Sequence, residues 1–259
     1  MTIECTVPRN IISSHVKLAL DEDIGQQDLT ADLISINAQA TATIITREDA
    51  TLCGQAWLND VFTQLDPAIK IHWYFADGDR LKADDVICQL DGPAKTLLTG
   101  ERTAMNFIQT LSATATHAQR YADEVQGLAA HILDTRKTIP GLRTAQKYAV
   151  ATGGCDNHRI GLFDAFLIKE NHIAACGGIT QAVNAARKLA PEKPIEVEVE
   201  TIQQLIEAES SKADIIMLDN FSEEQLEKIA SIDIKHAKIE LSGNISLDNH
   251  RSGNHQQHI

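Results

Sequence analysis

The sequence predicts an α/β protein in which an antiparallel N-terminal sheet is followed by a barrel-like domain with a parallel sheet. Three observations support this fold class. Short β-rich pieces separated by turn residues occupy the first part of the 259-residue chain. From residue 131 onward, short apolar runs alternate with helical stretches, which is typical of βαβ units. Polar residues directly follow most of these runs, as they do at the carboxyl ends of barrel strands, where active sites are found.

The N-terminal domain is expected to cover residues 1–112. A short amphipathic run at 12–20 predicts a helix beside the sheet, and a region with few helix breakers predicts a long helix from 100 to about 121. The candidate strands of the antiparallel sheet are 42–46, 71–75 and 85–90.

The second domain, 113–259, is expected to carry the active site. Its candidate strands are 131–133, 165–168, 195–199, 215–218 and 238–241. Its candidate helices are 142–150, 179–189, 202–209 and 223–229. This alternation alone leaves open whether the sheet is open or closes into a barrel. The polar residues at successive strand ends favour a barrel with the site at its mouth.

Composition and charge exclude several classes of protein. Hydrophobic residues make up 43% and charged residues 23% of the chain, so fibrous and intrinsically disordered classes are excluded. The net charge of −13 disfavours nucleic acid and anionic membranes as partners. The start of the chain shows no signal-peptide pattern. Five cysteines without a C-x-x-C pair indicate free thiols, and we expect a cytoplasmic protein.

Basic residues gather in one segment of this acidic chain. Residues 131–172 contain six Lys or Arg against four Asp or Glu, which points to a small anionic substrate. Arg136 and Lys137 stand where a candidate strand meets a loop, and the arginine fork suits a carboxylate or a phosphate. Ordinary surface ion pairing is the alternative for any single basic residue.

Acidic residues alternate along one candidate strand. Glu196, Glu198 and Glu200 share one face of this strand, and apolar residues share the other. With Asp219 one strand later, these carboxylates predict a site for Mg²⁺ or for ribose hydroxyls. An edge strand with a solvated acidic face is the alternative.

Two loops complete the candidate site. Gly153-Gly154 precedes His158-Arg159 and allows backbone to approach a ligand, although a lone histidine is more often structural than catalytic. Ser242-Gly243-Asn244 follows a candidate strand, and its backbone N–H groups can cradle a phosphate.

Six longer motifs are spread along the chain. They are Gly100-Glu-Arg-Thr-Ala-Met-Asn106, Asp134-Thr-Arg-Lys-Thr-Ile-Pro-Gly-Leu-Arg143, Lys147-Tyr-Ala-Val150, Asn157-His-Arg159, Leu167-Ile-Lys-Glu-Asn-His172 and Met217-Leu-Asp-Asn220. Together they resemble the quinolinate phosphoribosyltransferase family, also called nicotinate-nucleotide pyrophosphorylase (carboxylating), from about Leu18 to Asn249. The resemblance implies an N-terminal α/β sandwich domain followed by an open, TIM-like α/β barrel. It also implies homodimers whose active site is shared between subunits.

The resemblance further implies a pentosyltransferase of NAD biosynthesis. Such an enzyme converts quinolinate and 5-phosphoribosyl-1-diphosphate (PRPP) to nicotinate mononucleotide, diphosphate and CO₂ with Mg²⁺. By resemblance, the catalytic residues are Lys137, Glu198 and Asp219, and the two acids are also candidate Mg²⁺ ligands. Arg102 would reach into the neighbouring subunit's site. The implied substrate-binding set is Arg102, Arg136, Lys137, His158, Arg159, Lys169, Glu198, Asp219, Ser242, Gly243 and Asn244.

The chain departs from the family pattern at two places. Gly153-Gly154-Cys155 stands where the family has three glycines, and a cysteine is tolerated there unless Cys155 requires a positive φ. After Asn249 the family continues with a helix and a final strand that bears a second glycine-rich phosphate turn, whereas 250–259 is polar. We therefore expect the last barrel strand to be missing, with lower solubility or weaker PRPP binding as a result.

Two other functions stay open. One is a catalytically impaired relative that still dimerises or binds quinolinate. The other is a Schiff-base lyase that uses Lys137 or Lys169 at a strand end. Quinolinate turnover, quinolinate binding without turnover, and borohydride trapping with carbonyl compounds would distinguish the three functions.

Overall fold

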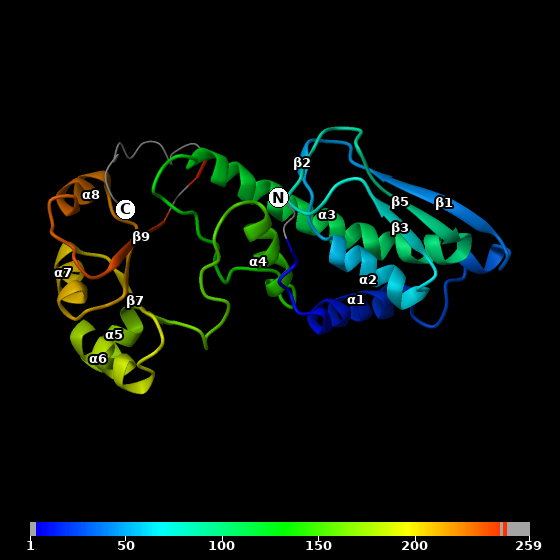
Figure 1. Cartoon of the computed structure of the whole chain (residues 1–259). Helices are drawn as coiled ribbons and strands as arrows, with labels where there is room; N and C mark the ends of the chain where they lie inside the picture. Colours follow the sequence, from blue (N-terminus) through cyan, green and yellow to red (C-terminus); the bar gives the residue numbers. More distant parts are fainter. Residues whose placement is uncertain (1–3, 244–245, 248–259) are drawn as a thin grey trace. The chain divides into compact units, whose positions relative to one another are not determined.

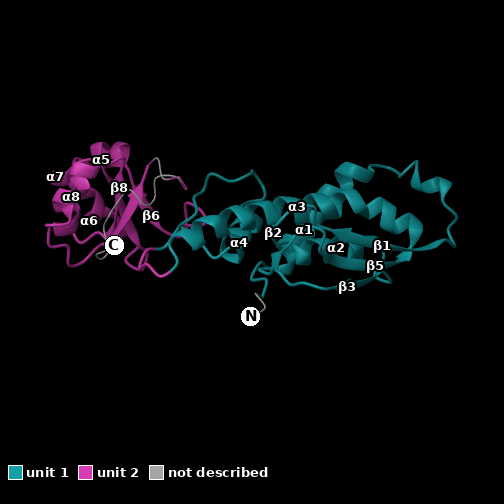
Figure 2. Ribbon diagram, turned by 90° about the horizontal axis from the view of Figure 1, so that it is seen from above, with its two compact units in different colours: residues 1–126, 131–158 teal, residues 127–130, 159–259 magenta. Residues whose placement is uncertain are grey.

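The computed structural model describes residues 4–243 and 246–247, which form two compact units (Figures 1 and 2). The first unit takes its described residues from 1–126 and 131–158, and the second from 127–130 and 159–259. The expected domain limits, 1–112 and 113–259, stay a prediction. None of the described helices is both long enough and apolar enough to cross a membrane.

The first unit is built on an antiparallel sheet with the strand order β1-β5-β3. The register places Leu90 between Ala42 and Ile71, and all three side chains pack in the hydrophobic core. A separate antiparallel pair joins β2 and β4. The strands are β1 (Gln39–Ile45), β2 (Ala50–Thr51), β3 (Lys70–Trp73), β4 (Arg80–Leu81) and β5 (Val86–Pro93).

Helices cover this sheet and supply most of the core. The long helix α3 contacts β1, β5 and α2, and α1 packs against both α2 and α3. Ala104, Ile108, Leu111 and Ala115 recur at the three- and four-residue spacing of one helix face, and all four are buried. The helices are α1 (Arg9–Ile24), α2 (Gln55–Leu65), α3 (Ala94–Glu124) and α4 (Arg143–Thr152), with a 3₁₀ turn at Ala31–Leu33.

Helix α4 packs closely on α3 because a glycine follows it. A Cβ on Gly153 would overlap the carbonyl oxygen of Ala115 and lie 2.7 Å from the Cβ of Ala118. Cys155 does not have a positive φ, and its thiol donates to the Ala118 carbonyl at 3.2 Å. The cysteine is therefore accommodated at a position where the family pattern has a third glycine.

The second unit is a parallel sheet whose strand order, β6-β7-β8-β9, follows the chain. Helices α6 and α7 pack against its strands (Figure 1). The strands are β6 (Phe166–Ile168), β7 (Ile195–Val199), β8 (Ile215–Asp219) and β9 (Lys238–Ser242). The helices are α5 (Glu170–Cys176), α6 (Ile179–Leu189), α7 (Ile202–Ser210) and α8 (Glu223–Ile229).

The α/β class, with its parallel C-terminal sheet, is confirmed. Within the described residues the four strands of this sheet form no closed barrel. The predicted strand at 131–133 was wrong, because its one strand-type partner is a single bridge from Leu133 to Asp156. The expected loss of a final strand falls on the chain after Asn249, which lies outside the described residues.

Candidate active site

Alternation along β7 sorts its side chains onto two faces of the parallel sheet. Ile195, Val197 and Val199 are fully buried in the core formed with the helices, so Glu196 and Glu198 lie on the opposite face. The strand lies between β6 and β8, and Glu196 is 1% exposed. The alternative of a solvated edge strand was therefore wrong, because β7 pairs with β6 on one edge and with β8 on the other.

The face away from the helices gathers the site residues that the second unit contributes. Register places Glu198 beside Met217, and Asp219 beside Ser242. Lys169 directly follows β6, and its ammonium forms an ion pair with the Glu198 carboxylate. The structure thus brings Lys169, Glu198, Asp219 and Ser242 to the carboxyl ends of neighbouring strands, which is where parallel α/β sheets bind ligands.

The Lys169–Glu198 pair is half-accessible. The lysine side chain is 43% exposed, whereas that of Glu198 is 12% exposed. A partly exposed ammonium is thus held by a largely buried carboxylate. Such an ammonium can contact an incoming anion without losing its protein partner.

The turns after β8 and β9 pack against each other. The backbone N–H of Asn220 donates to the Ser242 carbonyl at 2.9 Å, and the Asn220 side-chain nitrogen donates to Asp219 Oδ2 at 3.1 Å. A Cβ on Gly243, which has a φ of 105°, would overlap Asn220 Oδ1. Glycine is therefore required there. Asn244, the third residue of the predicted phosphate turn, lies outside the described residues.

Arg159 stands at the start of a tightly bonded loop. Its guanidinium donates to the Ala165 carbonyl at 3.4 Å, and the Asp164 carboxylate accepts the N–H groups of Ile160 and Gly161 at 2.6 and 3.1 Å. Burial raises the pKa of Asp164, but these N–H donors and Arg159 outweigh it and hold the pKa below its ordinary value. The loop after Arg159 is thus fixed by its own carboxylate.

In the first unit, α4 presents Arg143 and Lys147 one helical turn apart. The Lys147 ammonium pairs with the Asp134 carboxylate and donates to the His158 carbonyl at 2.9 Å. Arg143 donates to the Thr138 hydroxyl at 3.2 Å and to the Arg136 carbonyl at 3.5 Å. Helix α4 thus holds both the segment 134–138 and the turn at 157–158.

These contacts show that not every basic residue of 131–172 is available to a ligand. Lys147 was counted among the residues that make 131–172 cationic, but it is 3% exposed and neutralised by Asp134. Lys137 is exposed, and the Nε of Arg136 is buried without a hydrogen-bond partner in the described part of the chain. Arg102 lies exposed on α3. Arg136 and Lys137 are therefore the candidates of this segment for contact with a ligand, whereas the charge of Lys147 is already paired.

The sequence-based set missed Asp134 and Asn157 as functional candidates. In the side-chain amide orientation that satisfies its neighbours, with the nitrogen facing Asp134, Asn157 donates to the Lys147 carbonyl at 2.9 Å and to the Asp134 carboxylate at 2.8 Å. One signal was present in the sequence. A lysine between Ala145, Tyr148 and Ala149, all apolar positions of one short helix, is a candidate for burial with a partner.

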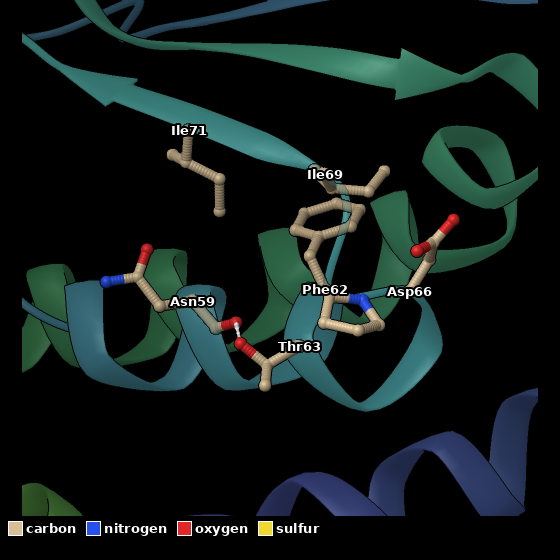
Figure 3. A pocket seen from close by; sticks show the side chains of 7 residues that line it. Asn59, Phe62, Thr63, Asp66, Ile69 and Ile71 are labelled. Atoms are coloured by element: carbon tan, nitrogen blue, oxygen red, sulfur yellow. Dashed lines mark hydrogen bonds between the residues drawn. The ribbon is translucent and has the colours of Figure 1, made fainter.

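A cavity of about 210 Å³ lies between α2 and β3 (Figure 3). It is lined by Asn59, Phe62, Thr63, Asp66, Pro67, Ile69 and Ile71. The Thr63 hydroxyl donates to the Asn59 carbonyl at 2.8 Å, and the Asp66 carboxylate accepts the N–H of Ala68. The elements that line it carry none of the predicted site residues, so we assign this cavity no role.

The fold and the sheet face are those of an α/β protein with a charged site at the carboxyl end of its parallel sheet. Lysine, carboxylates and a glycine turn meet at the carboxyl end of a parallel sheet. The matching family models are "Quinolinate phosphoribosyl transferase, N-terminal domain" over residues 28–112 and the C-terminal domain of the same family over 114–256. The chain belongs to the quinolinate phosphoribosyltransferase family.

Named relatives and a solved structure agree with this membership. The chain is 43% identical over 231 residues to a Bacillus subtilis protein named "Probable nicotinate-nucleotide pyrophosphorylase [carboxylating]", covering 88% of this chain and 79% of the relative. It is 37% identical to the Mycobacterium leprae nicotinate-nucleotide pyrophosphorylase (carboxylating), covering 90% and 85%. The structure of the nicotinate-nucleotide pyrophosphorylase from Francisella tularensis matches with a TM-score of 0.91 and 48% identity, covering 94% and 87%.

The family expected from the six motifs is confirmed, and so is the enzyme class, a phosphoribosyltransferase. These matches give no support to a Schiff-base lyase that uses Lys137 or Lys169. They leave the roles of individual residues as predictions.

Proposed function

We propose that this chain transfers the phosphoribosyl group of PRPP to quinolinate and releases CO₂, giving nicotinate mononucleotide and diphosphate for NAD biosynthesis. Membership of the quinolinate phosphoribosyltransferase family over both domains carries the proposal. The charged face at the carboxyl ends of β6 to β9 supports it, because the substrates are anionic.

Quinolinate carries two adjacent carboxylates, and basic side chains are their natural partners. We assign their recognition to Arg136, His158, Arg159 and Lys169, with Lys137 as a further contact to quinolinate or diphosphate. The Nε of Arg136, buried and without a hydrogen-bond partner among the described residues, supports its part, because an unsatisfied buried donor costs free energy until an acceptor binds it.

The ribose and diphosphate ends of PRPP are assigned to the second unit. Glu198 and Asp219 would bind the ribose hydroxyls, and the backbone of Ser242, Gly243 and Asn244 would bind the 5-phosphate. The same carboxylates fit Mg²⁺, because hard oxygen donors are the ligands this ion prefers. Glu198 and Asp219 lie on one face of adjacent strands. Bound there, Mg²⁺ would neutralise charge on the departing diphosphate.

The chemistry is electrostatic and positional rather than covalent. As the bond from ribose C1 to diphosphate breaks, positive charge develops at C1, and the carboxylates of Glu198 and Asp219 stabilise it. The pyridine nitrogen then forms the new bond to C1. The resulting ring cation stabilises the electron pair left at C2 when the 2-carboxylate leaves as CO₂, and a proton takes its place.

A shared active site and a cytoplasmic location are part of the same proposal. Arg102 is exposed on α3, as a residue that serves a neighbouring subunit must be. A homodimer would place this arginine in its partner's site. The cytoplasm is the compartment expected for a chain with five free thiols.

The purified chain should form nicotinate mononucleotide from quinolinate, PRPP and Mg²⁺. Nicotinate, which lacks the 2-carboxylate, is the matched control acceptor and should give no product. Activity with nicotinate alone would contradict the assigned acceptor. Quinolinate binding by folded protein without turnover would instead identify a catalytically impaired relative.

A further inference from the structure

We infer that Lys147 is a positioning residue for quinolinate binding, acting through Asp134 and the backbone of His158. The inference rests on the proposed function, because it concerns the segment assigned to the dicarboxylate. Lys147 is not among the residues proposed to touch substrate. Its ammonium instead contacts the Asp134 carboxylate and the His158 carbonyl.

One ion pair binds both backbone polar groups of His158. Lys147 donates to the His158 carbonyl at 2.9 Å, and Asp134 Oδ1 accepts the His158 N–H at 2.8 Å. The same Asp134 oxygen pairs with the Lys147 ammonium. The peptide units on either side of His158 are therefore fixed by two side chains from elsewhere in the chain.

The second carboxylate oxygen of Asp134 extends the network to Asn157, the residue before His158. It accepts the side-chain nitrogen of Asn157 at 2.8 Å, and that nitrogen also contacts the Lys147 carbonyl at 2.9 Å. Asp134 lies two residues before Arg136. The network thus ties the start of the 134–138 segment to the 157–158 turn, which the chain separates by more than twenty residues.

The burial of this pair supports a role beyond stabilising the fold. The side chains of Lys147 and Asp134 are 3% and 8% exposed. Removing two charges from water costs about as much as their attraction returns, and apolar pairs of similar volume are often equally stable. What an apolar pair lacks is the set of directed bonds to His158. We therefore assign the pair to the placement of His158 and of the neighbouring Arg136.

The chain contains a matched control for this arrangement. Asp214 Oδ2 also bridges a basic side chain and a backbone amide, accepting Arg187 at 2.9 Å and the Ile195 N–H at 2.7 Å. Ile195 begins β7, so this pair sits at the amino end of the strand, away from the predicted site. Arg187→Met removes an ion pair with the same bonding pattern, although its side chains are 37% and 34% exposed, without touching the quinolinate segment.

The experiment compares Lys147→Met, the double variant Asp134→Leu/Lys147→Met, and Arg187→Met in the full chain. Lys147→Met should lower the Tm and raise the KM for quinolinate at least about tenfold, as expected for loss of a charged hydrogen bond. The double variant should regain most of the Tm, because no unpaired charge stays buried, yet keep the raised KM. Arg187→Met should lower the Tm and leave the KM unchanged.

Recovery of both Tm and KM in the double variant would overturn the inference, since the pair would then be structural only. If the double variant does not fold, Asp134→Ala/Lys147→Ala replaces it. This variant also removes both bonds to His158 without leaving a buried charge, so it should still raise the KM for quinolinate, and a normal KM would again overturn the inference.

Hydrogen–deuterium exchange separates this inference from the proposed function. The amides of 156–160 should exchange faster in the Lys147 variants than in the parent chain or in Arg187→Met. If the parent chain neither binds nor turns over quinolinate, the proposed function fails. Unchanged exchange at 156–160 would contradict the positioning role whether or not the parent chain is active.

Discussion

Arg136 and Lys147 are basic residues of the same segment, but they differ in whether their charged groups have partners within the protein. Lys147 has its partners inside the protein, namely Asp134 and the His158 carbonyl. The Nε of Arg136 is buried and has no partner among the described residues. The environment of each side chain therefore decides whether its charge is paired within the protein or is available to bind a ligand.

Arg136→Ala should lower the turnover of quinolinate by about a hundredfold or more, because a charged hydrogen bond to a carboxylate is worth up to about 3 kcal/mol. Steady-state kinetics would measure the loss. Arg47→Ala is the control. Arg47 is 80% exposed and pairs with Asp84 on the surface, so its loss should change little. Near-parental turnover in Arg136→Ala would remove this residue from the site.

His15 makes the stability of the first unit sensitive to mild acid. The indole N–H of Trp57 donates to His15 Nδ1 at 3.3 Å, and the two rings stack. Burial lowers the pKa of His15 below its ordinary value of 6.5, and a backbone hydrogen bond with Gly141 opposes this only in part. The folded protein thus holds His15 neutral, with its lone pair engaged.

Because the folded pKa is the lower one, the contribution of His15 to stability is complete above pH 6.5 and is lost as the pH falls from there toward the folded value. The free energy of unfolding, measured by denaturant titration across this range, should fall more steeply in the parent chain than in His15→Phe, whose ring can still stack on Trp57. Equal slopes in the two proteins would contradict this assignment.

At the scale of elements, the contact between α3 and α4 positions the predicted site. Helix α4 holds the 134–138 segment through Arg143 and Lys147, and it can approach α3 only because Gly153 has no side chain. Gly153 has a φ of −78°, so its requirement is steric and not conformational. We therefore expect a change in this close packing to affect substrate binding as well.

Gly153→Ala should lower the free energy of unfolding by about 1–3 kcal/mol, the usual cost of overpacking. The added methyl would overlap the Ala115 carbonyl oxygen, which belongs to the α3 backbone and cannot turn aside. Thermal or denaturant unfolding would measure the change, and the KM for quinolinate should rise as α4 shifts. Full stability in this variant would show that α3 and α4 can separate without cost.

At the scale of the whole molecule, the proposal of a shared site makes a prediction that a monomeric enzyme cannot meet. Arg102→Ala and Glu198→Ala should each be inactive alone. In mixed dimers, one site combines the intact Glu198 of one subunit with the intact Arg102 of the other. Random pairing of equal amounts should then restore about a quarter of the parental activity, as two-fold symmetry requires.

Co-expression of the two variants, followed by the nicotinate mononucleotide assay, tests this prediction. Each variant expressed alone forms only homodimers. It is the control and should stay inactive. If the co-expressed variants stay inactive although mixed dimers form, Arg102 serves its own subunit. If Arg102→Ala is active alone, the residue lies outside the site.

Local patterns were sufficient for much of the second unit. Helices α6 and α8 occupy the ranges that the sequence predicts, and β7 alternates as expected, with Val197 buried against the helices and Glu198 on the opposite face. Periodicity and helix caps are local, so a single sequence carries them. Helix α2 was missed, although Trp57, Leu58, Val61 and Phe62 repeat with a helical period.

The sequence by itself determined the family, the α/β class and the residues that the family motifs name. Only the tertiary structure decided which charges are paired. Lys169 meets Glu198 and Lys147 meets Asp134 across long stretches of chain, while 131–133 finds a single bridge instead of a strand partner. The physical reason is that periodicity depends on neighbours in sequence, whereas ion pairing, burial and strand pairing depend on which distant elements the packing brings together.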